Sequence, residues 1–281
     1  MGGLGNQMFQ YAAARSRADE LRLDLVLDGR YVERKSQHTG LAIDRFNVRA
    51  RHIKPQEVKA FSEPKIRLAR WLKRLVRPVQ AVFWETGFAF DRALGQQPAG
   101  TLLSGFWQSE QYIRAHDQIR QDLQLPATLG RSAQAMAELI TSCSSVALHV
   151  RRGDYLKDEK TMARYGLCSM EYYNQALSYV LAKIEGAKVF VFSDDPQWVK
   201  SNLKVPQDTC FVSSPSISAE EDLMLMSQCQ HQIIANSTFS WWGAWLNQNC
   251  DKIVVAPCPW FDDATISAQD LIPASWHQIK K

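Results

Sequence analysis

Two adjacent arginines form the clearest chemical signal in the sequence. Arg151 and Arg152 lie in the segment His-Val-Arg-Arg-Gly-Asp-Tyr at 149–155, which follows an apolar run of the kind that forms a buried strand. Guanidinium groups match phosphate oxygens in a bidentate geometry, so this loop suits a phosphate group. Asp154 of the same loop is a candidate to accept a proton or to orient an arginine. The alternative is an ion-paired loop that binds no ligand.

Two further polar segments also follow runs that predict strands. Asp194 and Asp195 precede a proline, so they can accept hydrogen bonds from a purine or a ribose, or one of them can cap a helix. The segment at 236–240 brings hydroxyl and backbone N–H groups to a helix N-terminus, which is a ready anion site, although capping alone explains one such hydroxyl. Its candidate binding residues are Asn236, Ser237, Thr238, Phe239 and Ser240.

Strands and helices alternate in the second half of the chain, which indicates a parallel sheet with ligands at the carboxyl ends of its strands. Strands are expected at 145–150, 188–193, 209–212, 231–235 and 252–256, and helices at 132–141, 169–184, 219–228 and 239–247, with a short helix from Pro196. The three polar loops then lie at one edge of one sheet. Together they suit a nucleoside diphosphate.

The first half of the chain is less regular. Gly-Gly-Leu-Gly-Asn at 2–6 predicts a tight turn before a helix at 7–21. Backbone donors of this turn would reach the nucleotide from a second domain. The sequence also predicts strands at 23–28 and 101–107, an irregular polar insertion at 31–50 and the start of a helix at Ser109. We place an N-terminal α/β domain at 1–128 and a C-terminal one at 129–281, which describes a cleft between two domains.

Residues 65–80 predict a basic amphipathic helix, with leucines and valines on one face and arginines and lysines on the other. Packing of the apolar face on the protein core is the favoured interpretation. Peripheral contact with an anionic membrane surface is the functional alternative.

The composition excludes several classes of protein. The chain has 281 residues, of which 46% are hydrophobic and 22% charged, so it is neither disordered nor a low-complexity chain. A net charge of +4 does not imply general nucleic-acid binding. No apolar run of roughly 18 residues predicts a membrane span. The six cysteines show no zinc-ligand spacing, and no signal peptide opens the chain, so we expect reduced cysteines and a cytoplasmic protein.

Three segments together resemble one known family. Gly-Gly-Leu-Gly-Asn-Gln-Met-Phe-Gln-Tyr at 2–11, His-Val-Arg-Arg-Gly-Asp-Tyr at 149–155 and Asn-Ser-Thr-Phe-Ser-Trp-Trp-Gly-Ala-Trp-Leu at 236–246 are similar to the α-1,2-fucosyltransferases of glycosyltransferase family 11. The resemblance implies a GT-B architecture with two Rossmann-like domains facing a cleft, the C-terminal one binding GDP-fucose and the N-terminal one the acceptor. Members usually have a strand before the glycine-rich loop, which this chain lacks.

The resemblance also implies an activity. L-Fucose would pass from GDP-β-L-fucose to the 2-hydroxyl of a galactoside with inversion and without a metal or other cofactor, in surface polysaccharide synthesis of the O-antigen type. The acceptor would be a galactose-terminated oligosaccharide, lipid-linked at the inner membrane face. The alternatives are another GDP-sugar or another linkage, and a nucleotide- or glycan-binding protein without catalysis.

Site residues follow from the matching motifs. Arg151 would bind the β-phosphate of the donor, with Arg152 beside it, and Asp154 is the candidate base, its rival role being to pair with Arg152. His149 and either Asp194 or Asp195 would contact the guanine or ribose. The glycine-rich segment would add donor contacts through Gly3, Gly5, Asn6 and Gln7.

Overall fold

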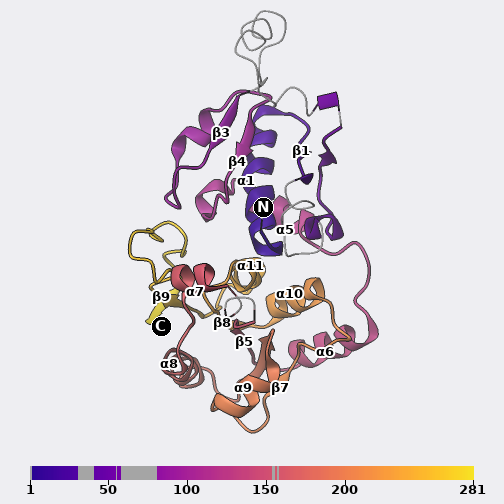
Figure 1. Ribbon diagram of the computed structural model, residues 1–281. Coiled ribbons are helices and arrows are strands. Elements are labelled where there is room, and N and C mark those ends of the chain that lie inside the picture. Colours follow the sequence, from indigo (N-terminus) through magenta and orange to yellow (C-terminus); the bar gives the residue numbers. More distant parts are fainter. Residues whose placement is uncertain (1, 31–40, 55, 58–80, 154–155, 157) are drawn as a thin grey trace, which may run out of the picture. The chain divides into compact units, whose positions relative to one another are not determined.

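The computed structural model describes residues 2–30, 41–54, 56–57, 81–153, 156 and 158–281 (Figure 1). The chain divides into two compact units, Met1–Leu123 and Gln124–Lys281. The expected helix at 65–80 lies outside the described residues, as does part of the expected insertion at 31–50. Each unit has its own sheet structure and its own core.

The second unit is built on a six-stranded parallel sheet. Its strand order is β10-β9-β8-β5-β6-β7, and every neighbouring pair is parallel. The strands are β5 (Ser145–Val150), β6 (Lys188–Ser193), β7 (Cys210–Phe211), β8 (His231–Ile233), β9 (Val254–Cys258) and β10 (His277–Lys280). The helices are α6 (Arg131–Thr141), α7 (Glu159–Tyr165), α8 (Met170–Leu181), α9 (Pro196–Asn202), α10 (Ala219–Gln228) and α11 (Thr238–Leu246).

Both faces of this sheet are covered, which explains why apolar residues predominate in its central strands β5 and β6. Val146, Leu148 and Val150 of β5 pack with residues of α8 and α9, whereas Ala147 packs on the other face with residues of α6 and α10. All six residues of β5 are buried. A strand buried on both sides is typical of a parallel sheet between helix layers.

Helix α11 is fixed at several points. Its Gly243 faces α10, where an added Cβ would lie 2.5 Å from the sulfur of Met226, so the two helices approach closely. The indole N–H of Trp241 donates to the carbonyl of Leu271 at 2.8 Å. At the other end, the Lys252 ammonium donates to the last carbonyls of the helix, those of Ala244 and Asn247. The N-terminus of α11 is therefore held rigidly at the sheet edge.

The first unit has smaller sheets. It contains α1 (Leu4–Leu21), β1 (Val26–Leu27), β2 (Arg51–His52), β3 (Val82–Trp84), β4 (Leu102–Ser104), α5 (His116–Asp122) and the 3-10 helices η1 (Ala42–Arg45), η2 (Arg92–Gln96) and η3 (Glu110–Tyr112). Strands β1 and β2 pair in parallel, as do β3 and β4. Trp107, which is 1% exposed, lies at the centre of a cluster with Ala13, Leu94 and Tyr112.

A buried carboxylate ties the first unit together. Asp122 is 1% exposed and accepts hydrogen bonds from Tyr11 Oη at 2.8 Å and Gln118 Nε2 at 2.9 Å. The guanidinium groups of Arg49 and Arg15 lie 3.2 and 3.6 Å from it. Burial without such partners would be costly for a charged group, so this cluster fixes α1 against α5.

Several expected elements differ in extent from the structure. Helix α1 begins at Leu4, not Gln7, because Gly3 serves as its N-cap and its carbonyl accepts the Gln7 N–H at 3.1 Å. Of this segment only Gly2 has the left-handed conformation, with φ of 72°. The expected strand at 23–28 is limited to β1, and the helix expected at Ser109 is the single 3-10 turn η3.

The strand expected at 101–107 ends at Ser104 for a clear reason. The backbone N–H groups of Phe106 and Trp107 donate to the carboxylate of Glu85, at 2.6 and 2.8 Å, instead of continuing the sheet. Trp107 itself has φ of 57°, a left-handed conformation that does not fit a strand. The short elements β2, β3, β10, α5 and α7 were not expected from the sequence pattern.

Candidate functional site

The three polar loops of the second unit follow strands that are neighbours in the sheet. Strand β5 lies between β8 and β6, and Val150 at the end of β5 pairs with Ser193 at the end of β6. Because all three strands are parallel, the loops that follow them lie at the same edge, as the sequence predicts. The carboxyl edge of this sheet is the candidate site.

Asp194 organises the loop after β5. Its two carboxylate oxygens accept the backbone N–H groups of Arg152 and Gly153, each at 2.9 Å, and Arg151 Nη1 lies 3.2 Å from the same carboxylate. A Cβ at position 153 would lie 2.9 Å from Asp194 Oδ2, so the close approach requires glycine. Asp194 thus orients Arg151, and the ion-paired loop considered from the sequence does form.

Arg152 has a different environment from its neighbour. Its guanidinium carbon lies 3.6 Å from the centroid of the Trp198 ring, and its Nε lies 3.9 Å from a carboxylate oxygen of Asp195. Asp195 is also the N-cap of α9, where it accepts the Trp198 N–H at 3.1 Å. Cation–π contact and the charge of Asp195 therefore hold Arg152 against the start of α9.

His149 is a neutral, buried side chain at this edge. It is 3% exposed, and its ring lies 5.7 Å from that of Phe239. Burial, with the positive charge of Arg151, lowers the pKa of His149 to about 3. Its Nδ1 has no hydrogen-bond partner among the described residues. A neutral imidazole in this position can accept or donate one hydrogen bond to a ligand.

A third carboxylate lies near the same edge and was missed from the sequence. Asp222, in the first turn of α10, accepts the Ser213 hydroxyl at 2.6 Å, and Ser213 Oγ accepts the Ser193 N–H at 3.1 Å. Burial raises the pKa of Asp222 to about 6. Its Oδ1 has no partner within the described parts of the chain. Acids in a first helical turn usually serve the helix, yet Glu221 completes the capping box with Ser218, so Asp222 has no part in that cap.

The segment at 236–240 divides into structural and accessible members. The Asn236 amide, 1% exposed, donates to the carbonyls of Tyr165, Gly166 and Trp260 at 2.7, 3.3 and 3.2 Å. Ser240 is fully buried and donates to backbone carbonyls at 3.3 Å.

The remaining members of this segment begin α11. Ser237 caps the helix by accepting the Phe239 N–H. Thr238 and Phe239 are half-buried at the N-terminus of α11. They are the members of the segment that can most readily touch a ligand.

The residues expected to contribute from the first unit gather at the N-terminus of α1. Gly3 is the N-cap, Gly5 is buried in the first turn, and Gln7 Nε2 donates to the Gly2 carbonyl at 3.1 Å. Asn6 Oδ1 accepts a hydrogen bond from Gln108 Nε2 at 2.8 Å. Gln108 is 2% exposed, which shows that this end of α1 is closely packed.

Four further points concern Asp154, membrane spans, metal ligands and the cysteines. Asp154 lies outside the described residues, so its contacts are not part of the site geometry. No helix in the described segments is long and apolar enough to cross a membrane. The described residues also contain no group of three or more His, Cys, Asp or Glu that would hold a metal ion. All six cysteines are free.

Comparison with known proteins identifies related sequences over the whole chain. The model of the family "Glycosyl transferase family 11" matches residues 95–280. The chain is 31% identical over 285 residues to the "Alpha-1,2-colitosyltransferase" of Escherichia coli, covering 100% of this chain and 97% of that protein. It is 32% identical over 289 residues to the "O-antigen biosynthesis glycosyltransferase WbnK" of the same organism, covering 92% of this chain and 93% of that protein.

A more distant relative and a solved structure extend the comparison. The "Galactoside alpha-(1,2)-fucosyltransferase 1" of Homo sapiens is 30% identical over 156 residues, which are 51% of this chain and 42% of that protein. The fold is similar to that of the fucosyltransferase NodZ from Bradyrhizobium, with a TM-score of 0.52 and 18% identity over 86% of this chain and 89% of that one. The expected GT-B-type α/β fold is confirmed by this likeness and by the parallel sheets.

The neutral state of His149 predicts a pH dependence of stability. Its pKa falls from an ordinary 6.5 to about 3 on folding, so the unfolded chain binds a proton in this window that the folded chain does not. The free energy of unfolding contributed by this residue is therefore present above pH 6.5 and is lost as the pH falls towards 3. Between pH 7 and pH 4.5 the loss should be roughly 2 to 3 kcal/mol larger in the wild type than in His149→Gln. Urea unfolding at both pH values measures this, and equal losses in the two proteins would contradict it.

Proposed function

Because the chain belongs to glycosyl transferase family 11, we propose that it transfers L-fucose from GDP-β-L-fucose to the 2-hydroxyl of a galactoside. The observation that carries the proposal is the similarity, along essentially the whole chain, to a transferase named for an α-1,2 linkage. The similarity to a transferase named for O-antigen biosynthesis supports a role in surface polysaccharide assembly. The acceptor in this proposal is a galactose-terminated, lipid-linked oligosaccharide. Membrane contact through residues 65–80 stays a prediction.

The donor nucleotide fits the carboxyl edge of the sheet in the second unit. Arg151, oriented by Asp194, supplies a fixed positive charge for the β-phosphate. The neutral His149 and the Asp222 carboxylate supply hydrogen-bonding atoms that lack partners within the described residues, which suits the N–H groups and ring nitrogens of guanine. A structure of NodZ soaked with GDP-fucose supports a donor of this class for the fold.

The roles of the two aspartates after β6 differ from the sequence expectation in this proposal. Asp194 accepts two backbone N–H groups and pairs with Arg151, and Asp195 caps α9. Both carboxylates therefore have partners within the protein. We assign them the positioning of the two arginines and assign the recognition of the base to His149 and Asp222.

Transfer with inversion requires a single displacement. The oxygen of the acceptor 2-hydroxyl attacks the anomeric carbon of fucose from the face opposite GDP. The bond from that carbon to the β-phosphate oxygen breaks, and GDP leaves with the electron pair. Positive charge develops on the sugar, as in glycoside hydrolysis, and negative charge on the departing phosphate. Arg151 and the N-terminus of α11 stabilise the departing phosphate without a metal ion.

The proton of the attacking hydroxyl needs an acceptor, and Asp154 is the proposed base. Its rival role is to hold Arg152 in place. Arg152 already has contacts with Trp198 and Asp195, which supports the assignment of Asp154 to proton transfer.

A second candidate donor is favoured by one relative. The name of the Escherichia coli relative assigns it the transfer of colitose, which is L-fucose without the 3-hydroxyl group. The same phosphate and base contacts serve either sugar nucleotide. The two candidates differ only in the contacts made to that hydroxyl.

Donor binding provides the first test. Isothermal titration with GDP, GDP-fucose, GDP-colitose and UDP, all with EDTA present, should show binding of the guanine nucleotides and none of UDP. EDTA removes divalent metals, so binding in its presence does not depend on them. UDP should not bind, because a pyrimidine does not satisfy the hydrogen-bonding groups of a site for guanine. Incubation with the preferred sugar nucleotide and a β-galactoside should then give an α-1,2-linked product. Binding of UDP equal to that of GDP, or nucleotide binding that depends on Mg²⁺, would contradict the proposal.

Removal of the charge at Arg151 should impair the chemical step. The Arg151→Ala variant loses the group that stabilises the departing phosphate, which corresponds to about 3 kcal/mol in the barrier, or roughly a hundredfold in turnover. Arg151→Lys, which keeps the charge without the bidentate geometry, should retain an intermediate rate. Steady-state kinetics measure both, and turnover of Arg151→Ala near that of the wild type would remove this residue from the mechanism.

Asp154→Asn separates the two roles of the carboxylate. If Asp154 is the base, its loss costs at least about a hundredfold in turnover while GDP affinity is unchanged. Arg152→Ala is the matched variant. If Asp154 serves only to hold Arg152, replacing Asp154 in the Arg152→Ala variant causes no further loss of turnover. Equal losses in the two single variants and in the double variant would assign Asp154 to positioning.

A further inference from the structure

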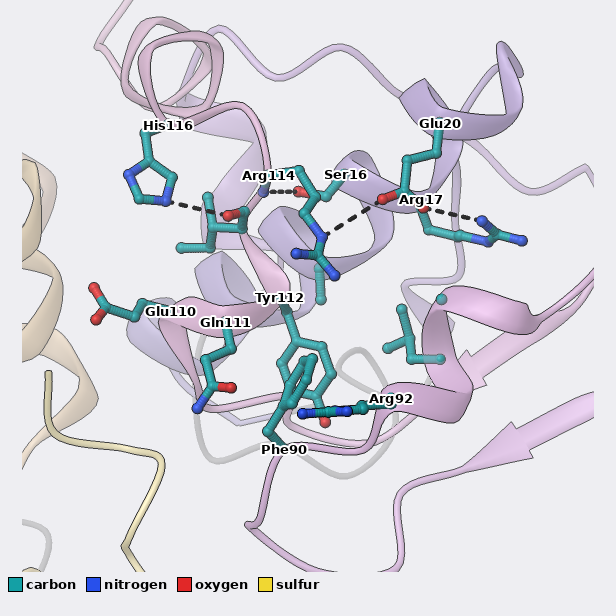
Figure 2. A pocket seen from close by; sticks show the side chains of 14 residues that line it. Ser16, Arg17, Glu20, Phe90, Arg92, Glu110, Gln111, Tyr112, Arg114 and His116 are labelled. Atoms are coloured by element: carbon teal, nitrogen blue, oxygen red, sulfur yellow. Dashed lines mark hydrogen bonds and ion pairs between the residues drawn. The ribbon is translucent and has the colours of Figure 1, made fainter.

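A pocket in the first unit is not used by the donor site. It has a volume of about 560 Å³ and lies between the second half of α1, the segment at 90–95 and the segment at 110–116 (Figure 2). This size is within the range of small-molecule binding sites, which is about 300 to 1,000 Å³.

The walls of the pocket are tied to one another. The Tyr112 hydroxyl accepts the Asp91 N–H at 2.7 Å, which joins η3 to the start of η2. The Ser16 hydroxyl accepts the Arg114 N–H at 3.1 Å, which joins α1 to the segment after η3. The Arg17 guanidinium donates to the Gln97 carbonyl at 2.6 and 3.1 Å. Three elements are thus fixed around the pocket, and its shape is preformed.

The lining combines aromatic rings with charges of both signs. The rings of Phe90 and Tyr112 lie 4.7 Å apart, and Figure 2 shows them on one side of the pocket. On the other side, Glu20 pairs with Arg17 at 2.9 Å and with Arg114 at 3.5 Å. Because one carboxylate is shared by two arginines, this side offers acceptors beside donors and keeps one net positive charge.

The combination of carboxylate, guanidinium and aromatic groups suits a sugar. Each sugar hydroxyl both donates and accepts hydrogen bonds, so it is satisfied by a surface that presents carboxylate oxygens beside guanidinium N–H groups. The C–H groups on one face of a pyranose can pack on aromatic rings, whose faces carry partial negative charge.

The pocket lies on the same face of α1 as a residue of the glycine-rich segment. Asn6, Ala13, Arg17 and Glu20 lie within about 60° of one another around the helix, since 3.6 residues make one turn. The last three line the pocket, and Asn6 belongs to the glycine-rich segment. At 1.5 Å per residue, the pocket begins about 10 Å from Asn6 and extends to about 20 Å along the same face.

The chain after β4 runs alongside α1. Gln108 bonds to Asn6 in the first turn of α1, and Arg114 bonds to Ser16 three turns later. Glu110 and Gln111, between these two points, line the pocket. An elongated ligand on this face of α1 can therefore reach both the pocket and the glycine-rich segment, for which the family resemblance predicts donor contacts.

We propose that this pocket binds a sugar unit of the acceptor oligosaccharide beyond the galactose that receives fucose. The proposal rests on the function proposed above, because it takes the acceptor to be a galactose-terminated glycan. The pocket then selects the length of the acceptor, while the reacting galactose is held elsewhere. Its occupant is a pyranose with free hydroxyl groups.

Two glycines provide a matched pair of variants for the test. A Cβ built at Gly95, which lines the pocket, meets no atom within 4 Å, and the same holds at Gly87, which does not line it. Because the Cβ position at Gly95 is open, Gly95→Trp should place an indole in the pocket without a clash at Cβ. Gly87→Trp makes the same chemical change in the same unit and serves as the control.

The first readout is acceptor kinetics with methyl β-D-galactopyranoside and with lacto-N-tetraose, which carries a terminal β-galactose. Gly95→Trp should raise KM for the tetrasaccharide about tenfold, the loss expected when one or two hydrogen bonds to charged groups are removed, and leave KM for the monosaccharide within about twofold. Gly87→Trp should change neither value. Equal effects of Gly95→Trp on both acceptors, or no effect on either, would overturn the proposal.

A second readout does not depend on turnover. In saturation-transfer NMR, with and without GDP, the wild type should transfer magnetisation to sugars of lacto-N-tetraose beyond the terminal galactose. Gly95→Trp should lose this transfer and Gly87→Trp should keep it. Transfer confined to the terminal galactose in the wild type, or no transfer, overturns the pocket assignment. Failure to bind GDP counts instead against the proposed function, so the two failures are distinguishable.

Discussion

The carboxylate of Asp194 is the interaction on which the candidate donor site depends. It ends one strand and accepts two backbone N–H groups from the loop that ends the neighbouring strand, while it pairs with Arg151. This arrangement requires β5 and β6 to be parallel and in the observed register, with Val150 opposite Ser193. Gly153 is required as well, because a side chain would meet the carboxylate. One anionic group thus fixes both the course of a loop and the direction of a guanidinium.

The electrostatics of this edge separate two kinds of recognition. Arg151 keeps its charge near the surface, which suits a phosphate, and the same charge together with burial keeps His149 neutral. A neutral imidazole and a half-buried carboxylate suit the polar edge of a purine, which carries no charge. Arg152 is turned to the Trp198 ring, so two adjacent arginines of the same loop have different roles. The two arginines have different roles because their neighbours differ, although they are the same type of residue.

The two units carry different parts of the proposed reaction. The second unit presents a rigid sheet edge and helix terminus, which suits a nucleotide that must be held in one orientation. The first unit presents α1, with the glycine-rich segment at one end and the pocket farther along the same face. Its fixed points are the buried Asp122 and the Glu85 carboxylate, which holds the turn at Trp107. A glycan acceptor is elongated, and a helix face with a pocket along it is a suitable surface.

The sequence by itself determined the family, the alternation of strands and helices in the second unit, and the meeting of three polar loops at one sheet edge. It did so because apolar runs with the period of a strand or helix, and glycine or proline at their ends, are local signals. The tertiary structure alone decided which polar residues are free to act. Asn236 is occupied by three carbonyls, Asp194 and Asp195 by the arginine loop and a helix cap, and Asp222 emerged as a candidate. The partners of Asn236 and Asp194 lie 24 to 71 residues away, and no local pattern encodes a partner at that separation, whereas the helix cap at Asp195 is local and was among the alternatives that the sequence offered.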